Sequence, residues 1–422
     1  MTHIYLSLLL IGGMLTSLLA QTTHSISMGA NYAQGEYYQL ATNATSSLAH
    51  ANWDIAFGVY STTAAGIFIN EGSSFSGTPP TLYVVPNKNF TDNITTNDLG
   101  ATLVNPEKSW SKGAFNTTQT VGDGLDYGWG SYQMTSHKIL GTRLYVIELG
   151  NGTYKKITID SLVNGVYHFQ TANLDGSSLQ HHSIDKSTFP NQTLAYFSFA
   201  TNSVSRVEPA GGWDFLFTRY QTTLYSSGVA TPYTVGGILL NQGVEAVLAD
   251  GINPATVDIN NYTLGMDSLT IIGHDWKSFD FSAGWSVEQD RVYFVKTADG
   301  QLYKVEFIDF QGSSSGIATF QKTYLGVWNN LPKTPQQLVS QLGAFPNPAT
   351  TELNVTFSLP QALEEVQLSL HNALGQAVYQ QNSSTQVGLN GRVIPVNHLP
   401  KGTYFLTLQA QQELITTSII IQ

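Results

Sequence analysis

The chain has 422 residues, of which 42% are hydrophobic and 11% are charged; its formal net charge is −11 and it contains no cysteine. This length suggests about three domains, and the hydrophobic fraction is sufficient for buried cores. The charged fraction is less than half of the roughly 25% found in ordinary soluble domains. The excess of acidic residues excludes nucleic acids and anionic lipids as partners. The lack of cysteine excludes disulfides, thiolate metal sites and lipid attachment to cysteine.

The beginning of the chain has the pattern of a secretory signal peptide. Residues 4–19 form an apolar run that is followed by Ala20-Gln21. A membrane anchor is the alternative, but the run is shorter than the roughly 20 residues that a bilayer span requires. We therefore expect residues 1–20 to be cleaved. Because no other apolar segment approaches the length of a span, we expect no transmembrane segment in the mature chain.

The body of the chain contains an internal repeat. Three pairs of similar blocks follow one another in the same order, which is the signature of duplicated domains. The paired blocks are residues 37–57 and 196–217, 66–72 and 237–243, and 143–147 and 291–295. Their order predicts two tandem domains, at residues 25–190 and 191–328.

Both repeats have the pattern of β-strands. Short runs of Val, Ile, Tyr, Phe and Thr alternate with polar residues and are separated by Asn-Gly and Asp-Gly, which favour tight hairpins. One predicted hairpin joins Val292–Val295 to Leu302–Phe307 through Asp299-Gly300. No helical period extends beyond about ten residues after the signal peptide. The chain is therefore predicted to be all-β, with long loops at 73–128 and 244–275.

A third module is predicted after a linker at residues 329–343, which are polar and proline-containing. Residues 344–422 open with Phe345-Pro346-Asn347-Pro348, where the prolines favour an extended entry and a turn. Strand patterns then recur in a segment of about 80 residues, a size typical of a small immunoglobulin-like β-sandwich. The predicted strands are 353–359, 366–370, 404–408 and 415–421.

This module resembles the C-terminal sorting domain of type IX secretion substrates. The resemblance is carried by Phe-Pro-Asn-Pro-Ala-Thr at 345–350, Leu-His-Asn-Ala-Leu-Gly at 370–375 and Leu-Pro-Lys-Gly-Thr-Tyr at 399–404. It implies that the protein interacts with the type IX secretion machinery, crosses the outer membrane and is released or attached at the cell surface. An ordinary immunoglobulin-like domain that stays on the mature protein is the alternative.

The two repeats resemble the HmuY family of secreted haem-binding β proteins. The second repeat is the better match and carries the resemblance in strand and turn residues. These are Tyr196–Phe199, Gly212–Asp214, Arg291–Lys296 and Lys304–Phe310. The resemblance implies two tandem β domains of that fold, and haem or a haem protein as the partner.

The same resemblance implies candidate haem-iron ligands. The family holds iron between two His or Met side chains, one of them five residues after a Trp. That position is Met134 in the first repeat, and a thioether is a suitable axial ligand. Met266 and His274 lie in the long loop of the second repeat. A haem between Met134 on one side and Met266 or His274 on the other is one possibility; a core thioether and a loop histidine are the alternatives.

Other residues that suggest chemistry have structural explanations. Asp54 and Asp214 each follow a Trp at the start of a strand, and their duplication favours a structural hydrogen bond over a glycosidase pair. Gly312–Gly316 has the letters of a serine nucleophile motif, but the strand pattern that follows favours a hairpin loop. Neighbouring residues of a strand point to opposite faces, which disfavours a metal site at His181 and His182, and we expect a solvated loop there.

We therefore expect a secreted, non-enzymatic binding protein that takes up haem or a related tetrapyrrole for iron acquisition. The alternative is a surface interaction or adhesion protein that keeps the fold without iron ligation.

Overall fold

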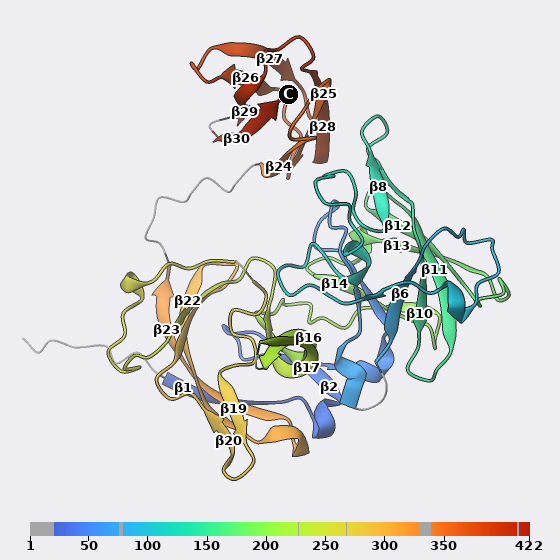
Figure 1. Ribbon diagram of the computed structural model, residues 1–422. Helices are drawn as coiled ribbons and strands as arrows, with labels where there is room; N and C mark the ends of the chain where they lie inside the picture. Colours follow the sequence, from blue (N-terminus) through green and yellow to red (C-terminus); the bar gives the residue numbers. More distant parts are fainter. Residues whose placement is uncertain (1–20, 76–78, 227, 267, 329–338, 412) are drawn as a thin grey trace, which may run out of the picture.

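The computed structural model describes residues 21–75, 79–226, 228–266, 268–328, 339–411 and 413–422 (Figure 1). The predicted signal peptide and most of the predicted linker lie outside these residues. The described chain is all-β, as predicted, and its helices are short 3-10 turns. These are η1 Ala30–Tyr32, η2 His50–Asn52, η3 Gly72–Phe75, η4 Thr96–Asp98, η5 Ala114–Asn116, η6 Lys186–Thr188, η7 Ile259–Asn261 and η8 Gly312–Ser314.

The first of two β-sandwiches, sandwich I, pairs a large sheet with a sheet of four strands. The large sheet has the order β13-β12-β11-β10-β6-β7, with β8 and β9 attached to it. Its strands are β6 Thr81–Val85, β7 Thr102–Leu103, β8 Gly130–Gln133, β9 Lys138–Gly141, β10 Leu144–Glu148, β11 Tyr154–Val163, β12 Val166–Ala172 and β13 Gln180–Asp185. The second sheet contains β4 Ile55–Gly58, β5 Ile67–Ile69, β14 Leu194–Ser198 and β15 Ser203–Ser205.

Sandwich II has the same plan. Its larger sheet has the order β1-β23-β22-β21-β18, with strands β1 Gln21–Ser27, β18 Glu245–Ala249, β21 Val292–Lys296, β22 Gln301–Phe310 and β23 Ile317–Val327. The facing sheet contains β2 Gln34–Tyr38, β3 Thr45–Ala49, β16 Phe215–Ser226 and β17 Val229–Leu240. A separate hairpin is formed by β19 Lys277–Asp280 and β20 Gly284–Val287. The hairpin predicted around Asp299-Gly300 is confirmed as β21 and β22.

Each sandwich is closed by the apolar side chains that its two sheets turn toward each other. In sandwich I, Phe57 of β4 lies over Phe169 of β12 with ring centroids 4.9 Å apart. In sandwich II, Phe217 of β16 stacks on Phe320 of β23 at 5.9 Å. All four rings are at most 1% exposed. This burial of apolar surface is the main force that holds the sheets together.

The strands do not divide at the predicted boundary between residues 190 and 191. Strands β1 to β3 belong to the first repeat, yet β1 pairs with β23 and β2 pairs with β16. Strands β14 and β15 lie beyond the boundary, yet β14 pairs with β4. Figure 1 shows β1 beside β23. Sandwich I is therefore a continuous segment, and it is inserted between β3 and β16 of sandwich II.

The two long loops predicted from the sequence are wrong in part. The first contains the strands β6 and β7, and the second contains β18. The longer strand of the first loop, β6, is the one to compare with β18. These two strands pair with β10 and β21, and they occupy equivalent places in the two large sheets. Each strand has five residues, so its local pattern is short, and pairing with a distant strand determines the structure.

The C-terminal module is a sandwich of a three-stranded and a four-stranded sheet. Its strands are β24 Ser340–Phe345, β25 Glu352–Leu359, β26 Val366–Asn372, β27 Ala377–Ser383, β28 Gly388–Pro395, β29 Gly402–Ala410 and β30 Glu413–Ile421. The four strands predicted there are confirmed. Strand β24 begins inside the predicted linker. The module has its own buried core, which includes Leu353, Leu370, Leu406 and Ile419.

Candidate functional site

The two sandwiches meet through a cluster of buried aromatic and aliphatic side chains. These are Tyr37, Leu48, Ala56, Phe68, Trp110, Leu194, Tyr196, Trp213 and Leu216. Trp110 of sandwich I donates its indole N–H to the carbonyl of Leu240 in sandwich II at 2.9 Å, and its ring lies edge-on to Trp213 at 6.1 Å. The interface is therefore packed like a domain core.

Asp54 and Asp214 each link the start of one strand to the end of the strand that pairs with it, β4 to β14 and β16 to β2. The Asp54 carboxylate accepts a hydrogen bond from the backbone N–H of Phe199 at 2.7 Å. The Asp214 carboxylate accepts the same bond from Leu40 at 2.7 Å. Desolvation by burial raises the pKa of both carboxyls, that of Asp214 to about 6. Their predicted structural role is confirmed by these bonds.

A buried hydrogen-bond network lies between the two sandwiches. The hydroxyls of Tyr37 and Tyr196, which are equivalent in the two repeats, are 2.5 Å apart. The Glu208 carboxylate bonds the Tyr196 hydroxyl. It also accepts the Trp213 indole N–H at 3.0 Å and the backbone N–H of Thr193 at 2.7 Å. Desolvation by burial raises the pKa of Glu208 to about 7.

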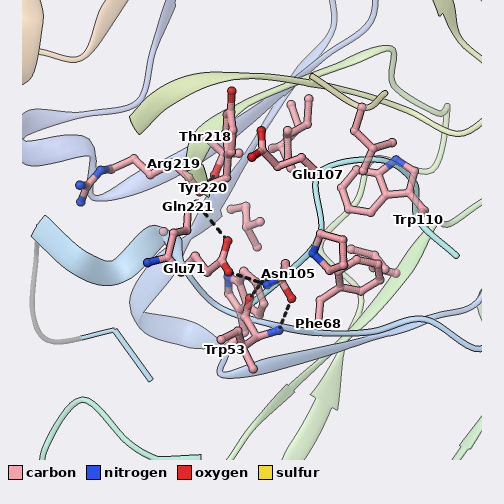
Figure 2. Close-up of a pocket in the computed structure, with 18 of the residues that line it drawn as sticks. Trp53, Phe68, Glu71, Asn105, Glu107, Trp110, Thr218, Arg219, Tyr220 and Gln221 are labelled. Carbon is pink, nitrogen blue, oxygen red and sulfur yellow. Dashed lines mark hydrogen bonds between the residues drawn. The ribbon is translucent and has the colours of Figure 1, made fainter. Parts of the chain in front are cut away.

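A pocket opens beside this network, between β16 of sandwich II and the loops of sandwich I (Figure 2). Its free volume is about 70 Å³. The apolar walls are formed by Leu48, Trp53, Phe68, Trp110, Leu194, Tyr196, Leu216, Leu239 and Leu269. Ligand pockets commonly occur at such junctions, with apolar walls and a few polar groups that orient the ligand.

Glu71 provides one polar group of the pocket. Its Oε1 accepts the backbone N–H of Asn105 at 2.8 Å, and its Oε2 accepts that of Gln221 at 3.0 Å. Desolvation by burial raises the pKa of Glu71 to about 7; the backbone hydrogen bonds oppose this increase, and the nearby Glu107 carboxylate adds to it. The bond to Gln221 joins the two sandwiches, because Gln221 belongs to β16.

Glu107 provides a second carboxylate. In Figure 2 its side chain extends toward Tyr220 of β16. Desolvation raises the pKa of Tyr220, and the Glu107 charge raises it further. The Tyr220 hydroxyl is 3.3 Å from Nδ1 of His274. Desolvation, and then the charge of Lys277, lower the pKa of His274, so this imidazole is neutral at neutral pH.

His50 lies directly behind Gly72, a residue of the pocket lining. A Cβ at this glycine would overlap the His50 ring, so glycine is required there. His50 is 1% exposed, and desolvation by burial, followed by the charge of Arg219, lowers its pKa to about 4. The wall behind Gly72 is therefore uncharged at neutral pH.

The structure does not bring the three predicted iron ligands to one centre. Met134 packs against the core of sandwich I and, through Cε, against Gly391 of the C-terminal module. Met266 is 55% exposed in sandwich II. His274 is near Tyr220, but neither it nor either methionine lines the pocket. A volume of about 70 Å³ is also far below the roughly 300–1,000 Å³ of pockets for drug-sized ligands. These residues do not fit a haem.

Gly312–Gly316 forms η8 and the turn into β23, as predicted. The solvated loop predicted for His181 and His182 is wrong, because both residues belong to β13 and pair with β12. The His182 ring stacks on Phe169 at 4.6 Å, while His181 is exposed. Across the described ranges, no group of three His, Cys, Asp or Glu side chains is arranged to hold a metal ion.

Comparison with known protein families identifies the C-terminal module. Residues 343–422 match the model of the secretion system C-terminal sorting domain. This module is a sorting domain. The protein is therefore secreted or attached to the outer cell surface, as predicted. No helix among the described residues is both long and apolar enough to cross a membrane.

The two sandwiches lie outside that match. The comparison with curated proteins gave no match. Among solved structures, dimeric latent PorU from Porphyromonas gingivalis aligns at 8% identity with a TM-score of 0.20. The alignment covers 95% of this chain and 34% of that chain, so the protein spans about a third of the PorU chain.

Sequence reasoning missed both carboxylates of the pocket. One signal was present in the repeat itself, because Glu71 in Gly-Ile-Phe-Ile-Asn-Glu-Gly corresponds to Gln242 in Gly-Ile-Leu-Leu-Asn-Gln-Gly. Because the second repeat has the same fold with an uncharged glutamine at this position, the charge of Glu71 is not needed for folding and indicates a functional role. Glu107 lies in an irregular loop and had no comparable signal.

Proposed function

We propose that the protein is a secreted, non-catalytic binding protein that holds a small ligand in the pocket between its two sandwiches. One observation carries this proposal: aromatic walls from both sandwiches enclose a pocket that has two carboxylates at its polar side. The resemblance of the repeats to the HmuY family of secreted binding proteins supports binding rather than catalysis.

The ligand of this pocket is smaller than a haem. Its volume is about half of the roughly 150 Å³ of an apolar cavity that binds benzene. Because the pocket is open to solvent, it accommodates the head of a molecule while the remainder stays outside. The proposed ligand is therefore a molecule with a short apolar segment and one polar group.

The test uses calorimetric titration of the full chain with three probes of one chain length: n-butylamine, 1-butanol and butyrate. We expect saturable binding of at least one probe, and its loss in Leu269→Trp, where the larger ring fills the pocket. Leu374→Trp is the matched control, because Leu374 is 84% exposed in the sorting domain. If no probe binds, or if Leu269→Trp binds as well as the wild type, the proposal is wrong.

Haem binding for iron acquisition is tested separately, by titrating haem into the full chain and recording the Soret band. The positions of Met134, Met266 and His274 lead us to expect no saturable shift. A saturable shift that Met134→Ala abolishes would favour haem uptake instead.

A second candidate, a surface interaction or adhesion protein, is favoured by the hairpin of β19 and β20. Three aromatic side chains on it are exposed: Phe279 by 52%, Phe281 by 100% and Trp285 by 40%. Trp285 is held edge-on against Phe310 of β22 at 4.8 Å. Such an ordered, exposed aromatic group is typical of interaction surfaces.

This candidate predicts that the hairpin retains the protein at the cell surface. The test compares retention of labelled full chain on the producing cells for the wild type and a Phe279→Ser/Phe281→Ser variant. We expect lower retention of the variant with an unchanged melting temperature, because exposed substitutions affect stability little. Equal retention would count against the adhesion candidate.

A further inference from the structure

We infer that the pocket between the sandwiches recognises an organic cation, specifically the ammonium head of an alkylamine. This inference rests on the proposed function and specifies its ligand class. It follows from three features: the charge of the pocket, the position of the nearest basic groups, and the aromatic walls.

The pocket has carboxylates without a basic partner. Within the part of the chain that the structure describes, neither Glu71 nor Glu107 forms an ion pair with Lys or Arg. Each Glu71 oxygen accepts one backbone N–H, and the Asn105 side chain adds a further hydrogen bond. A carboxylate has about four acceptor sites, so Glu71 keeps acceptor capacity for a ligand. Two nearby carboxylates repel each other, and a bound cation relieves this repulsion. The pocket therefore favours a positive ligand over a negative one.

The basic side chains nearest to the carboxylates do not supply this positive charge. Arg219 lines the pocket with its stem, but Figure 2 shows its guanidinium extending away from Glu107 and Trp110. The guanidinium lies over the Tyr32 ring, 5.8 Å from the centroid. Lys277 donates to the carbonyls of Gly236 and His274. When both carboxylates are ionised, a cationic ligand can therefore supply the balancing positive charge.

The walls suit a cation as well. Trp53, Phe68, Trp110, Tyr196 and Tyr220 all line the pocket. The negative face of an aromatic ring attracts an ammonium group within about 6 Å, most strongly when water is excluded. A pocket lined by carboxylates and aromatic side chains is thus complementary to an ammonium group attached to a short hydrocarbon chain. An anion would face two carboxylates and gains nothing from the rings.

The size of the pocket restricts the cation further. A bare metal ion does not need aromatic walls, and across the described residues no group of three His, Cys, Asp or Glu is arranged to hold one. A free volume of about 70 Å³ accommodates the ammonium group and its first carbons. The ligand class is therefore an amine head group, free or at the end of a longer molecule.

The experiment compares n-butylamine, which is an ammonium ion at pH 7.5, with 1-butanol and butyrate, by calorimetric titration of the full chain. We expect the amine to bind about tenfold or more tightly than either other probe. Glu107→Gln should reduce amine affinity to that of 1-butanol. Its matched control is Glu288→Gln, which removes one carboxylate that does not line the pocket. A melting curve of each variant verifies that it is folded.

The outcomes separate this inference from the proposed function. If 1-butanol binds as tightly as the amine, the pocket binds ligands but the cation inference is wrong. If butyrate binds best, it is also wrong. If Glu107→Gln is folded and keeps full amine affinity, recognition does not depend on the carboxylate pair, and the inference fails. If no probe binds, both proposals fail.

Discussion

At the scale of single residues, the junction between the sandwiches contains a buried hydrogen-bond network of Tyr37, Tyr196 and Glu208. Tyr37 and Tyr196 come from equivalent strands of the two repeats and meet hydroxyl to hydroxyl. The Tyr196 hydroxyl has a second partner in Glu208, whereas the first repeat has no carboxylate at either corresponding position, Leu48 or Ala49. The two tyrosines are therefore equivalent in the repeat but not in their energetics.

This difference predicts unequal effects of removing the hydroxyls. Tyr196→Phe removes the hydroxyl partner of Tyr37 and one of the hydrogen bonds of Glu208, and we expect it to reduce the free energy of unfolding by about 1–3 kcal/mol. Tyr37→Phe leaves the bond between Tyr196 and Glu208 intact and should cost about 0.5–1.5 kcal/mol. Urea denaturation of the full chain measures both. A larger loss for Tyr37→Phe would show that Glu208 does not depend on Tyr196.

The raised pKa of Glu208 predicts a pH-dependent stability. A carboxyl whose pKa is about 7 when folded and 4.5 when unfolded stabilises the fold while protonated. That stability is complete below about pH 4.5 and is lost as the pH rises to about 7, a change of about 3 kcal/mol for a full shift. Glu71 and Asp214 act in the same direction.

Melting temperatures between pH 5 and 7 test this prediction. Lys277, whose pKa is lowered to about 7, is charged in both states in most of this range and adds little. His50, whose pKa is lowered to about 4, acts in the opposite direction, because its unfolded form binds a proton below about pH 6.5. We therefore compare slopes, and expect stability to fall more steeply with pH, or to rise less, in the wild type than in Glu208→Gln. The variant should be less stable at every pH, because its amide group meets the N–H donors of Thr193 and Leu194. An unchanged slope in Glu208→Gln would disprove the assignment.

At the scale of elements, most strands could be predicted from the sequence, but their partners could not. Alternation and turn residues correctly predict the hairpin of β21 and β22 and four strands of the sorting domain. The repeat correctly relates β2 to β14. The repeat does not show that β2 belongs to sandwich II and β14 to sandwich I. The two strands have the same sequence pattern, so either strand would fit either sheet. That choice depends on the short connections between β3 and β4 and between β15 and β16.

The candidate site was less predictable for the same reason. Its lining comes from β3, β16 and β17 of one sandwich and from β5, β14 and loops of the other, so no local motif contains it. The predicted ligands relied on a family pattern in single loops, and those loops place Met134 and Met266 in different sandwiches. Asp54 and Asp214 were interpreted correctly because a duplicated residue at a strand start indicates a structural role.

At the scale of the whole molecule, the two sandwiches are not interchangeable halves. Sandwich I is continuous, from β4 to β15, and keeps all its strands if it is cut out of the chain. Sandwich II is built from two separated segments. Its core contains Ile26, Met28, Tyr38 and Leu40 of the first segment, packed against Phe215, Phe217 and Phe320 of the second. Sandwich II can therefore fold only when its two segments, which sandwich I separates in the sequence, come together. Sandwich I folds from one continuous segment.

This asymmetry predicts which fragments fold. We expect residues 53–208 to give a β-type circular dichroism spectrum and a cooperative thermal transition. Residues 25–190 lack β14 and β15, and residues 191–328 lack β1 to β3, so both should unfold without cooperativity or aggregate. The 53–208 fragment should also self-associate at high concentration, because Phe68 and Trp110 lose their cover from sandwich II. Cooperative folding of 191–328 alone would show that β1 to β3 are dispensable and would refute the interdependence of the two segments.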